Sequence, residues 1–206
     1  MERLYFCQIP YYDFYDGTEA PDDPTCMNFL PIEIRGEGDE THEVLFGALP
    51  HAKSLPAALH EAADCDGIIH DAAVVFCAKA QNGAIVTVGW YRHANITLSP
   101  EYLPMTDEED GDFEHPFYFC TTRDSAVLLP IEVRFQPTWQ IPRAKAGRGA
   151  QRAKPGIGNE SLWIPGCEAQ TFCRAFSESM TAYEHTGDNL LCEDSDAKPD
   201  GHAPTC

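Results

Sequence analysis

More than two-fifths of the Lys and Arg residues in this chain, the side chains best suited to bind an anion, gather in one segment. Residues 133–159 contain six of the 14 Lys and Arg residues and no acidic residue: Arg134, Arg143, Lys145, Arg148, Arg152 and Lys154. A basic segment rich in Gly and Ala is typical of a loop that meets phosphate groups, because Gly lets backbone N–H groups come close to an anion. The alternative is a loop that pairs with the carboxylates of this 206-residue chain, whose formal net charge is -19.

A second group of candidate binding residues lies in the segment VTVGWYRHANI, residues 86–96. Trp90 could stack on a nucleobase, and Tyr91 would face the opposite side of the same strand. Arg92 has the planar fork that suits a phosphate, and the Asn95 amide could read a base edge. The alternatives are that Trp90 is a core aromatic and that Asn95 is a turn or capping residue.

These patterns favour a binding protein over an enzyme. The candidate ligand-binding residues are Trp90, Tyr91, Arg92, Asn95, Arg143, Lys145, Arg148, Arg152, Asn159 and Trp163. His70, Asp71 and His115 could serve acid–base chemistry, but no Ser or Cys lies in a nucleophile elbow. Nine cysteines without a C-x-x-C and eight histidines without an H-x3-H give no metal-site spacing. We therefore expect no catalytic residue, no metal and no cofactor.

The central part of the chain predicts a β-hairpin. Residues 72–80 (AAVVFCAKA) are almost continuously apolar, and Asn82-Gly83 separates them from a β-rich run at 84–98. Asn-Gly between two such runs is the strongest short hairpin signal, because both residues tolerate positive φ. Gly89 inside the second run predicts a bulge or a close backbone approach. Upstream, residues 54–65 (SLPAALHEAADC) have a helical start and helical spacing.

The whole pattern predicts an α+β fold, with a strand-dominated curled sheet or small β-barrel and one or two helices. We expect a single domain at 1–165, a C-terminal extension with room for a short helix at 166–185, and an acidic disordered tail at 186–206. The chain has no apolar run near the roughly 20 residues that span a membrane. Its start lacks the basic-then-apolar order of a signal peptide. We therefore expect a cytoplasmic protein with no membrane partner.

Several motifs resemble a little-characterised bacterial family, found alone or joined to restriction-type nuclease domains. They are MNFLPI (27–32), VTVGWYRHANI (86–96), AVLLPIEVR (126–134), IPRAKAGRGAQ (141–151) and GIGNESLW (156–163). The resemblance covers roughly residues 3–165. It implies a restriction or anti-restriction setting, with a nuclease domain or a host defence protein as a further partner. The chain departs from the family pattern at His93, where Asn is expected, and in a longer, more basic insert around 150–158.

The hairpin also resembles part of the PUA-like superfamily, which includes the EVE, ASCH and YTH domains. That resemblance implies a β-barrel in which an aromatic cage holds a flipped, often modified base. Our leading hypothesis is therefore a nucleic-acid reader that binds a nucleotide or a flipped, modified base, with DNA, RNA and free nucleotide left open. An acidic, phage-type decoy that binds a host DNA-binding enzyme is the alternative. A small-nucleotide hydrolase acting through His70 or His115 is the third.

Overall fold

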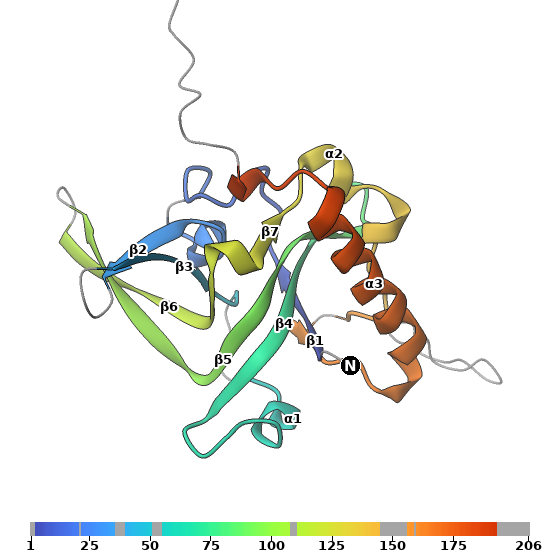
Figure 1. The fold of residues 1–206 in the computed structure, drawn as a ribbon, viewed down its shortest axis with the longest axis horizontal. Helices are drawn as coiled ribbons and strands as arrows, with labels where there is room; N and C mark the ends of the chain where they lie inside the picture. Colours follow the sequence, from blue (N-terminus) through green and yellow to red (C-terminus); the bar gives the residue numbers. More distant parts are fainter. Residues whose placement is uncertain are drawn as a thin grey trace, which may run out of the picture.

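One mixed β-sheet dominates the structure. The computed structural model describes residues 3–20, 22–35, 40–50, 55–107, 111–144, 156–158 and 160–192. The strands are β1 (Leu4–Ile9), β2 (Pro31–Arg35), β3 (Thr41–Gly47), β4 (Ile68–Lys79), β5 (Ile85–Asp107), β6 (Gly111–Thr122), β7 (Ala126–Leu128) and β8 (Leu162–Trp163). Their order is β2-β3-β6-β5-β4-β1-β8, and β7 also pairs with β5 (Figure 1). β1 runs parallel to β4, whereas the other strand pairs are antiparallel.

The predicted α+β curled sheet is confirmed, but the barrel alternative is wrong. β2 and β8 end the strand order and do not pair with each other in the part of the chain that is described, so the sheet stays open. The described residues form three α-helices, not one or two: α1 (Ala57–His60), α2 (Ile131–Arg134) and α3 (Gln170–Thr186). The 3-10 helices are η1 (Pro24–Met27), η2 (Arg123–Ser125), η3 (Pro137–Trp139), η4 (Cys167–Ala169) and η5 (Leu190–Cys192). None of the described helices is both long and apolar enough to cross a membrane.

The predicted hairpin joins β4 to β5. Gly83 has φ +83°, and the Asn82 side chain accepts a hydrogen bond from the N–H of Ala84, so both act as turn residues. Gly89 fulfils both parts of its prediction: the β4–β5 register shifts beside it, and a Cβ there would lie 2.2 Å from the carbonyl oxygen of Val127 on β7. The close approach of β7 therefore requires glycine at this position.

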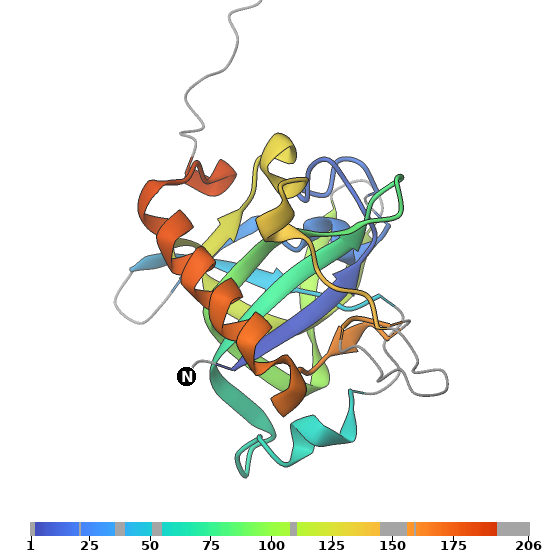
Figure 2. The ribbon, with the colours of Figure 1, turned by 90° about the vertical axis from the view of Figure 1, so that its right-hand side faces the viewer.

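β4 is apolar along most of its length because both of its faces are covered. Val74 and Phe76 point into one core with Tyr91, and Val75 and Cys77 point into a second core with Trp90. The second core is closed by α3, which lies across this face of the sheet (Figure 2). A strand buried on both sides has no polar face to alternate with the apolar one, which explains the run at 72–80.

The curl of the sheet comes from β5, which has 23 residues. Its first part pairs with β4 and its last part with β6, and the register against β6 shifts between Ile96 and Glu101. The helix predicted at 54–65 is shorter than expected, because Asp64 accepts hydrogen bonds from the N–H groups of Asp66 and Ile68 and so stabilises a turn. Ser54, its predicted cap, lies outside the described residues.

Candidate functional site

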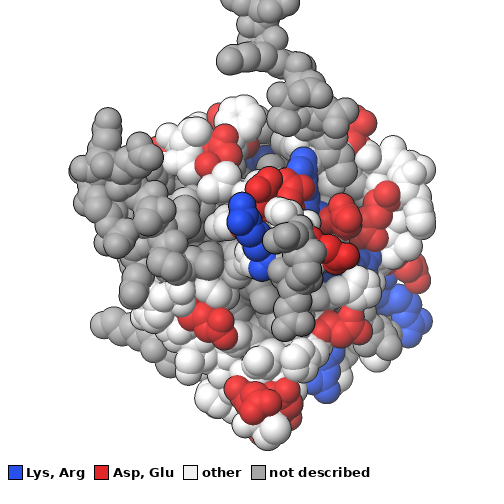
Figure 3. Space-filling model, turned by 60° about the vertical axis from the view of Figure 1, so that its left-hand side comes forward, with Lys and Arg blue, Asp and Glu red and all other residues white. Residues whose placement is uncertain are grey.

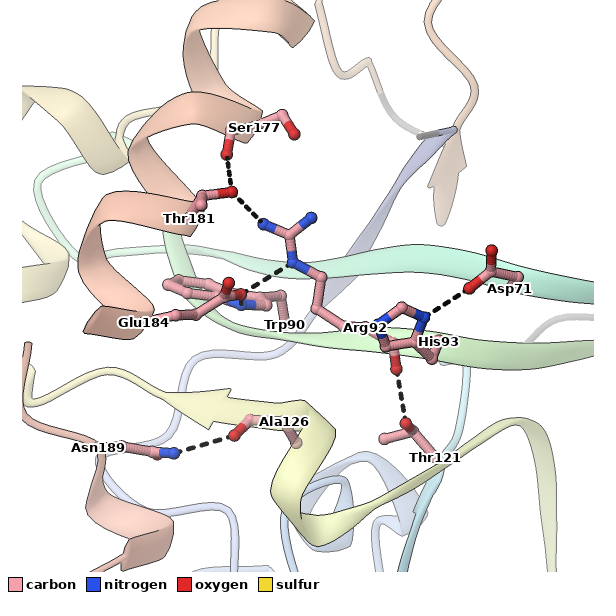
Figure 4. Close-up of polar contacts among 10 residues, drawn as sticks. All are labelled: Asp71, Trp90, Arg92, His93, Thr121, Ala126, Ser177, Thr181, Glu184 and Asn189. Carbon is pink, nitrogen blue, oxygen red and sulfur yellow. Dashed lines mark hydrogen bonds and ion pairs between the residues drawn. The ribbon is translucent and has the colours of Figure 1, made fainter. Parts of the chain in front are cut away.

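Trp90 is a core residue, so the expectation that it stacks on a base is not met. Its side chain is fully buried, and its ring stacks on Trp139 with 5.3 Å between the ring centres. Tyr183 packs against Trp90 in a T-shaped arrangement. The Trp90 Nε1–H donates a hydrogen bond of 2.7 Å to Glu184 on α3 (Figure 4). An indole with these partners offers no open face to a ligand.

Tyr91 lies on the opposite side of β5 and is buried as well. Its hydroxyl donates a hydrogen bond to the carbonyl oxygen of Asn28, and burial raises the pKa of the phenol well above its usual value. Tyr91 therefore ties MNFLPI to the hairpin and is not available to a ligand. Trp163 on β8 is 8% exposed and packs on Phe6, which makes it a core residue too.

Arg92 lies at the surface between the sheet and α3. Its Nε donates to Glu184 at 2.8 Å, and one of its terminal nitrogens donates to the Thr181 hydroxyl at 3.1 Å (Figure 4). One carboxylate oxygen of Glu184 thus accepts hydrogen bonds from both Trp90 and Arg92. A phosphate bound to Arg92 would have to share its guanidinium with Glu184 and Thr181 on α3.

The described part of the basic segment, which includes Arg143, does not lie near Arg92. Ile141 pairs with Ile85 at the far end of β5, and Arg143 forms a bridge with Ile157. Arg92 lies seven positions after Ile85 along β5, which places the two residues about 20 Å apart. The structure therefore puts Arg143 and Arg92 on separate surfaces.

Other members of the basic segment differ from the expectation or cannot be placed. Arg134 is fully buried and donates to three backbone carbonyls, so it is a structural residue. Packing alone requires glycine at position 156, because a Cβ there would lie 2.2 Å from the carbonyl oxygen of Pro142. Four predicted ligand-binding residues lie outside the described residues: Lys145, Arg148, Arg152 and Asn159.

A hollow of about 970 Å³ lies where β1, β4, β5, η2 and α3 meet. Its lining includes Arg3, His70, Asp71, Arg92, His93 and Glu184. Figure 3 shows one face of the molecule, on which Lys and Arg side chains lie directly beside Asp and Glu side chains. A cavity of this size lies within the range that holds small-molecule ligands. The structure thus offers a ligand site in a place that the Trp90 hypothesis did not predict.

His70 and Asn95 contact each other at this hollow. His70 Nδ1 lies 2.9 Å from Asn95 Oδ1, and His70 Nε2 lies 3.0 Å from Asp64 Oδ2. The hydrogen bond to Asn95 and then that to Asp64 raise the pKa of His70 above its usual value. Because both ring nitrogens face oxygen atoms, both donate only when the imidazole carries its second proton. Asn95 therefore positions a histidine and is not a free base-reading amide.

Asp71 and His93 form an unusual pair on the rim of the same hollow. The β4–β5 register shifts on each side of the Ala72–Ala94 pair, so each strand bulges there. Asp71 has φ 55° and His93 has φ 49°, and His93 Nδ1 lies 2.5 Å from Asp71 Oδ1. Positive φ is uncommon outside glycine, and such residues gather at functional sites. This pair is the strongest local indication of a site.

Sequence reasoning missed this arrangement in part. The sequence indicates acid–base chemistry at His70 and Asp71 and a departure from a family pattern at His93. It does not indicate that Asp71 and His93 lie next to each other. Arg3 and Glu184 gave no local signal, since their neighbours come from distant segments. The described residues contain no group of three or more His, Cys, Asp or Glu side chains placed to hold a metal ion.

Comparison of the chain with protein-family models, with curated proteins and with solved structures finds no match. The resemblances drawn from the sequence motifs therefore stay predictions.

Proposed function

We propose that this chain is a nucleic-acid reader that binds one nucleotide unit, free or within a strand, with its phosphate in the hollow of about 970 Å³. The observation that supports the proposal most is that Arg3, Arg92 and His70, whose hydrogen bonds raise its pKa, line the hollow beside the carboxylates of Asp71, Asp124 and Glu184. Charge-assisted hydrogen bonds from such groups are the usual means of holding a phosphate. The base pocket against Trp90 is not part of this proposal.

Arg3 is the principal phosphate partner in the proposal. Its side chain is exposed and, within the described residues, makes no ion pair, whereas Arg92 is paired with Glu184 and His70 with Asp64. An anion entering the hollow would therefore find one guanidinium that is not already engaged with a described carboxylate. Its flat fork suits bidentate contact with phosphate oxygens.

Binding of a labelled single-stranded 12-mer and of nucleoside 5′-monophosphates tests the proposal. We expect Arg3→Ala to weaken both by about tenfold, because a hydrogen bond to a charged group contributes about 1.5–3 kcal/mol. The slope of log affinity against log salt concentration for the 12-mer should also become shallower by about one, because one phosphate contact is lost. Arg35→Ala on β2 is the matched control, since it removes the same charge from an exposed residue outside the hollow. Equal affinities of the two variants would contradict the proposal.

The Asp71–His93 pair supports a second candidate, hydrolysis of a bound phosphoester. The carboxylate holds the proton on His93 Nδ1, which leaves Nε2 as the acceptor. His93 Nε2 would take a proton from a water whose oxygen attacks phosphorus, while the ester P–O bond breaks and the departing oxygen takes a proton from solvent. Release of nucleoside from a nucleotide by this protein, lost in His93→Gln, is the expected sign. Equal release by His93→Gln and the unaltered chain would exclude this role.

A further inference from the structure

A second hollow, of about 470 Å³, adjoins the proposed phosphate site. The two hollows share Arg3, Tyr5 and Ala62 in their linings. A ligand held at Arg3 can therefore extend from one hollow into the other.

The two hollows differ in chemistry. Charged side chains dominate the first. In the second, Leu4, Ile164 and Pro165 supply apolar surface and Glu61 adds one carboxylate. Gln170, the first residue of α3, adds one amide to these walls. The Gln170 side chain is exposed, and no hydrogen bond holds its amide within the described part of the chain. Its donor and acceptor are thus available to a ligand.

A nucleobase has the chemistry that such a pocket recognises. Its faces are apolar, and its edge carries the donors and acceptors that an Asn or Gln amide can pair with. Pockets for small ligands likewise combine apolar walls with a few polar groups. The charged hollow, by contrast, suits a phosphate.

We infer that the second hollow receives the base of the nucleotide whose phosphate lies in the first, with Arg3 at the junction and Gln170 reading the base edge. The inference rests on the proposed function and extends it, because it assigns a base subsite to residues on β1, α1 and α3. This subsite takes the place of the one that the sequence assigned to Trp90 and Asn95.

The experiment compares nucleotides with a probe that has no base. Affinities of the four nucleoside 5′-monophosphates and of ribose 5-phosphate are measured by calorimetry. We expect at least one nucleotide to bind tenfold or more tightly than ribose 5-phosphate. Ala58→Trp should remove that difference by filling the second hollow, and ribose 5-phosphate should bind as before.

Ala57→Trp is the matched control, because Ala57 is the exposed neighbour on α1 and does not line the hollow. Gln170→Leu should keep the tighter binding of nucleotides but reduce the differences among the four bases. Near-UV circular dichroism verifies that each variant keeps its fold. A difference that survives in Ala58→Trp, or equal binding of all probes, overturns this inference alone. Absence of binding by every probe overturns the proposed function and this inference together.

Discussion

Replacing Trp90 with phenylalanine should destabilise the fold and leave nucleotide affinity unchanged. The change removes the 2.7 Å hydrogen bond to the Glu184 carboxylate, and a bond to a charged group contributes about 1.5–3 kcal/mol. It also weakens the stacked contact with Trp139, which is worth about 0.5–1.5 kcal/mol. Together these losses predict a free energy of unfolding lower by about 2–4 kcal/mol.

Urea unfolding followed by far-UV circular dichroism measures this loss, and calorimetry measures nucleotide affinity. Trp139→Phe is the control: it disturbs the same stack but leaves the Trp90 hydrogen bond intact, so we expect a smaller loss of stability, about 0.5–1.5 kcal/mol. The reasoning would be refuted if Trp90→Phe weakened nucleotide binding tenfold, with a change in unfolding free energy below about 1 kcal/mol. The indole would then face the ligand and not the core.

Three further changes test the structural roles assigned to Arg134, Gly89 and His70. Arg134→Met should lower the free energy of unfolding by at least about 3 kcal/mol in urea, because three backbone carbonyls lose a charged donor; a loss under about 1 kcal/mol would contradict its structural role. Gly89→Ala should lower it by about 1–3 kcal/mol, since the added Cβ meets the Val127 carbonyl, whereas Gly158→Ala has open space around it and should be neutral. His70 has its pKa raised in the folded state, so its stabilising effect is present below the unfolded pKa and is lost as pH rises through the folded one. The stability gap between the unaltered chain and His70→Gln should therefore shrink between pH 5.5 and pH 8.5 in urea titrations, and a gap that grew would contradict the assigned hydrogen bonds.

The elements of the fold that depend on local sequence were predictable. Whether the sheet closes into a barrel or stays open was not. Asn82-Gly83 fixes the hairpin because few residues tolerate its turn geometry, and Gly89 marks the close approach of β7. The predicted strand at 72–80 began too late, since the bulge at Asp71 takes polar residues off the regular ladder. Whether the outermost strands of a sheet meet depends on twist and on what covers each face, and α3 covers one of them. No local pattern in the chain encodes that arrangement.

The candidate site was predictable only where its residues lie close together in sequence. The segment 86–96 does contribute Arg92 and His93 to the hollow, and Asn95 contacts His70 there. The roles of the neighbouring aromatic residues were misjudged, because an aromatic on a strand can serve a pocket or a core equally well. What decides between these roles for Trp90 is Glu184, 94 residues further along the chain. Pairings at that distance follow from packing, which a single sequence does not reveal.

The acidic composition is compatible with phosphate binding only if the attraction is local. At physiological salt the Debye length is about 8 Å, so carboxylates on distant surfaces scarcely weaken an arginine that is not paired nearby. A nucleotide reader of this kind should show a small salt dependence that falls when Arg3 is removed. An acidic protein that binds a basic partner uses many carboxylates at once, so its affinity would depend steeply on salt and would not need Arg3. The response of binding to Arg3→Ala at two salt concentrations therefore separates the two functions more sharply than affinity alone.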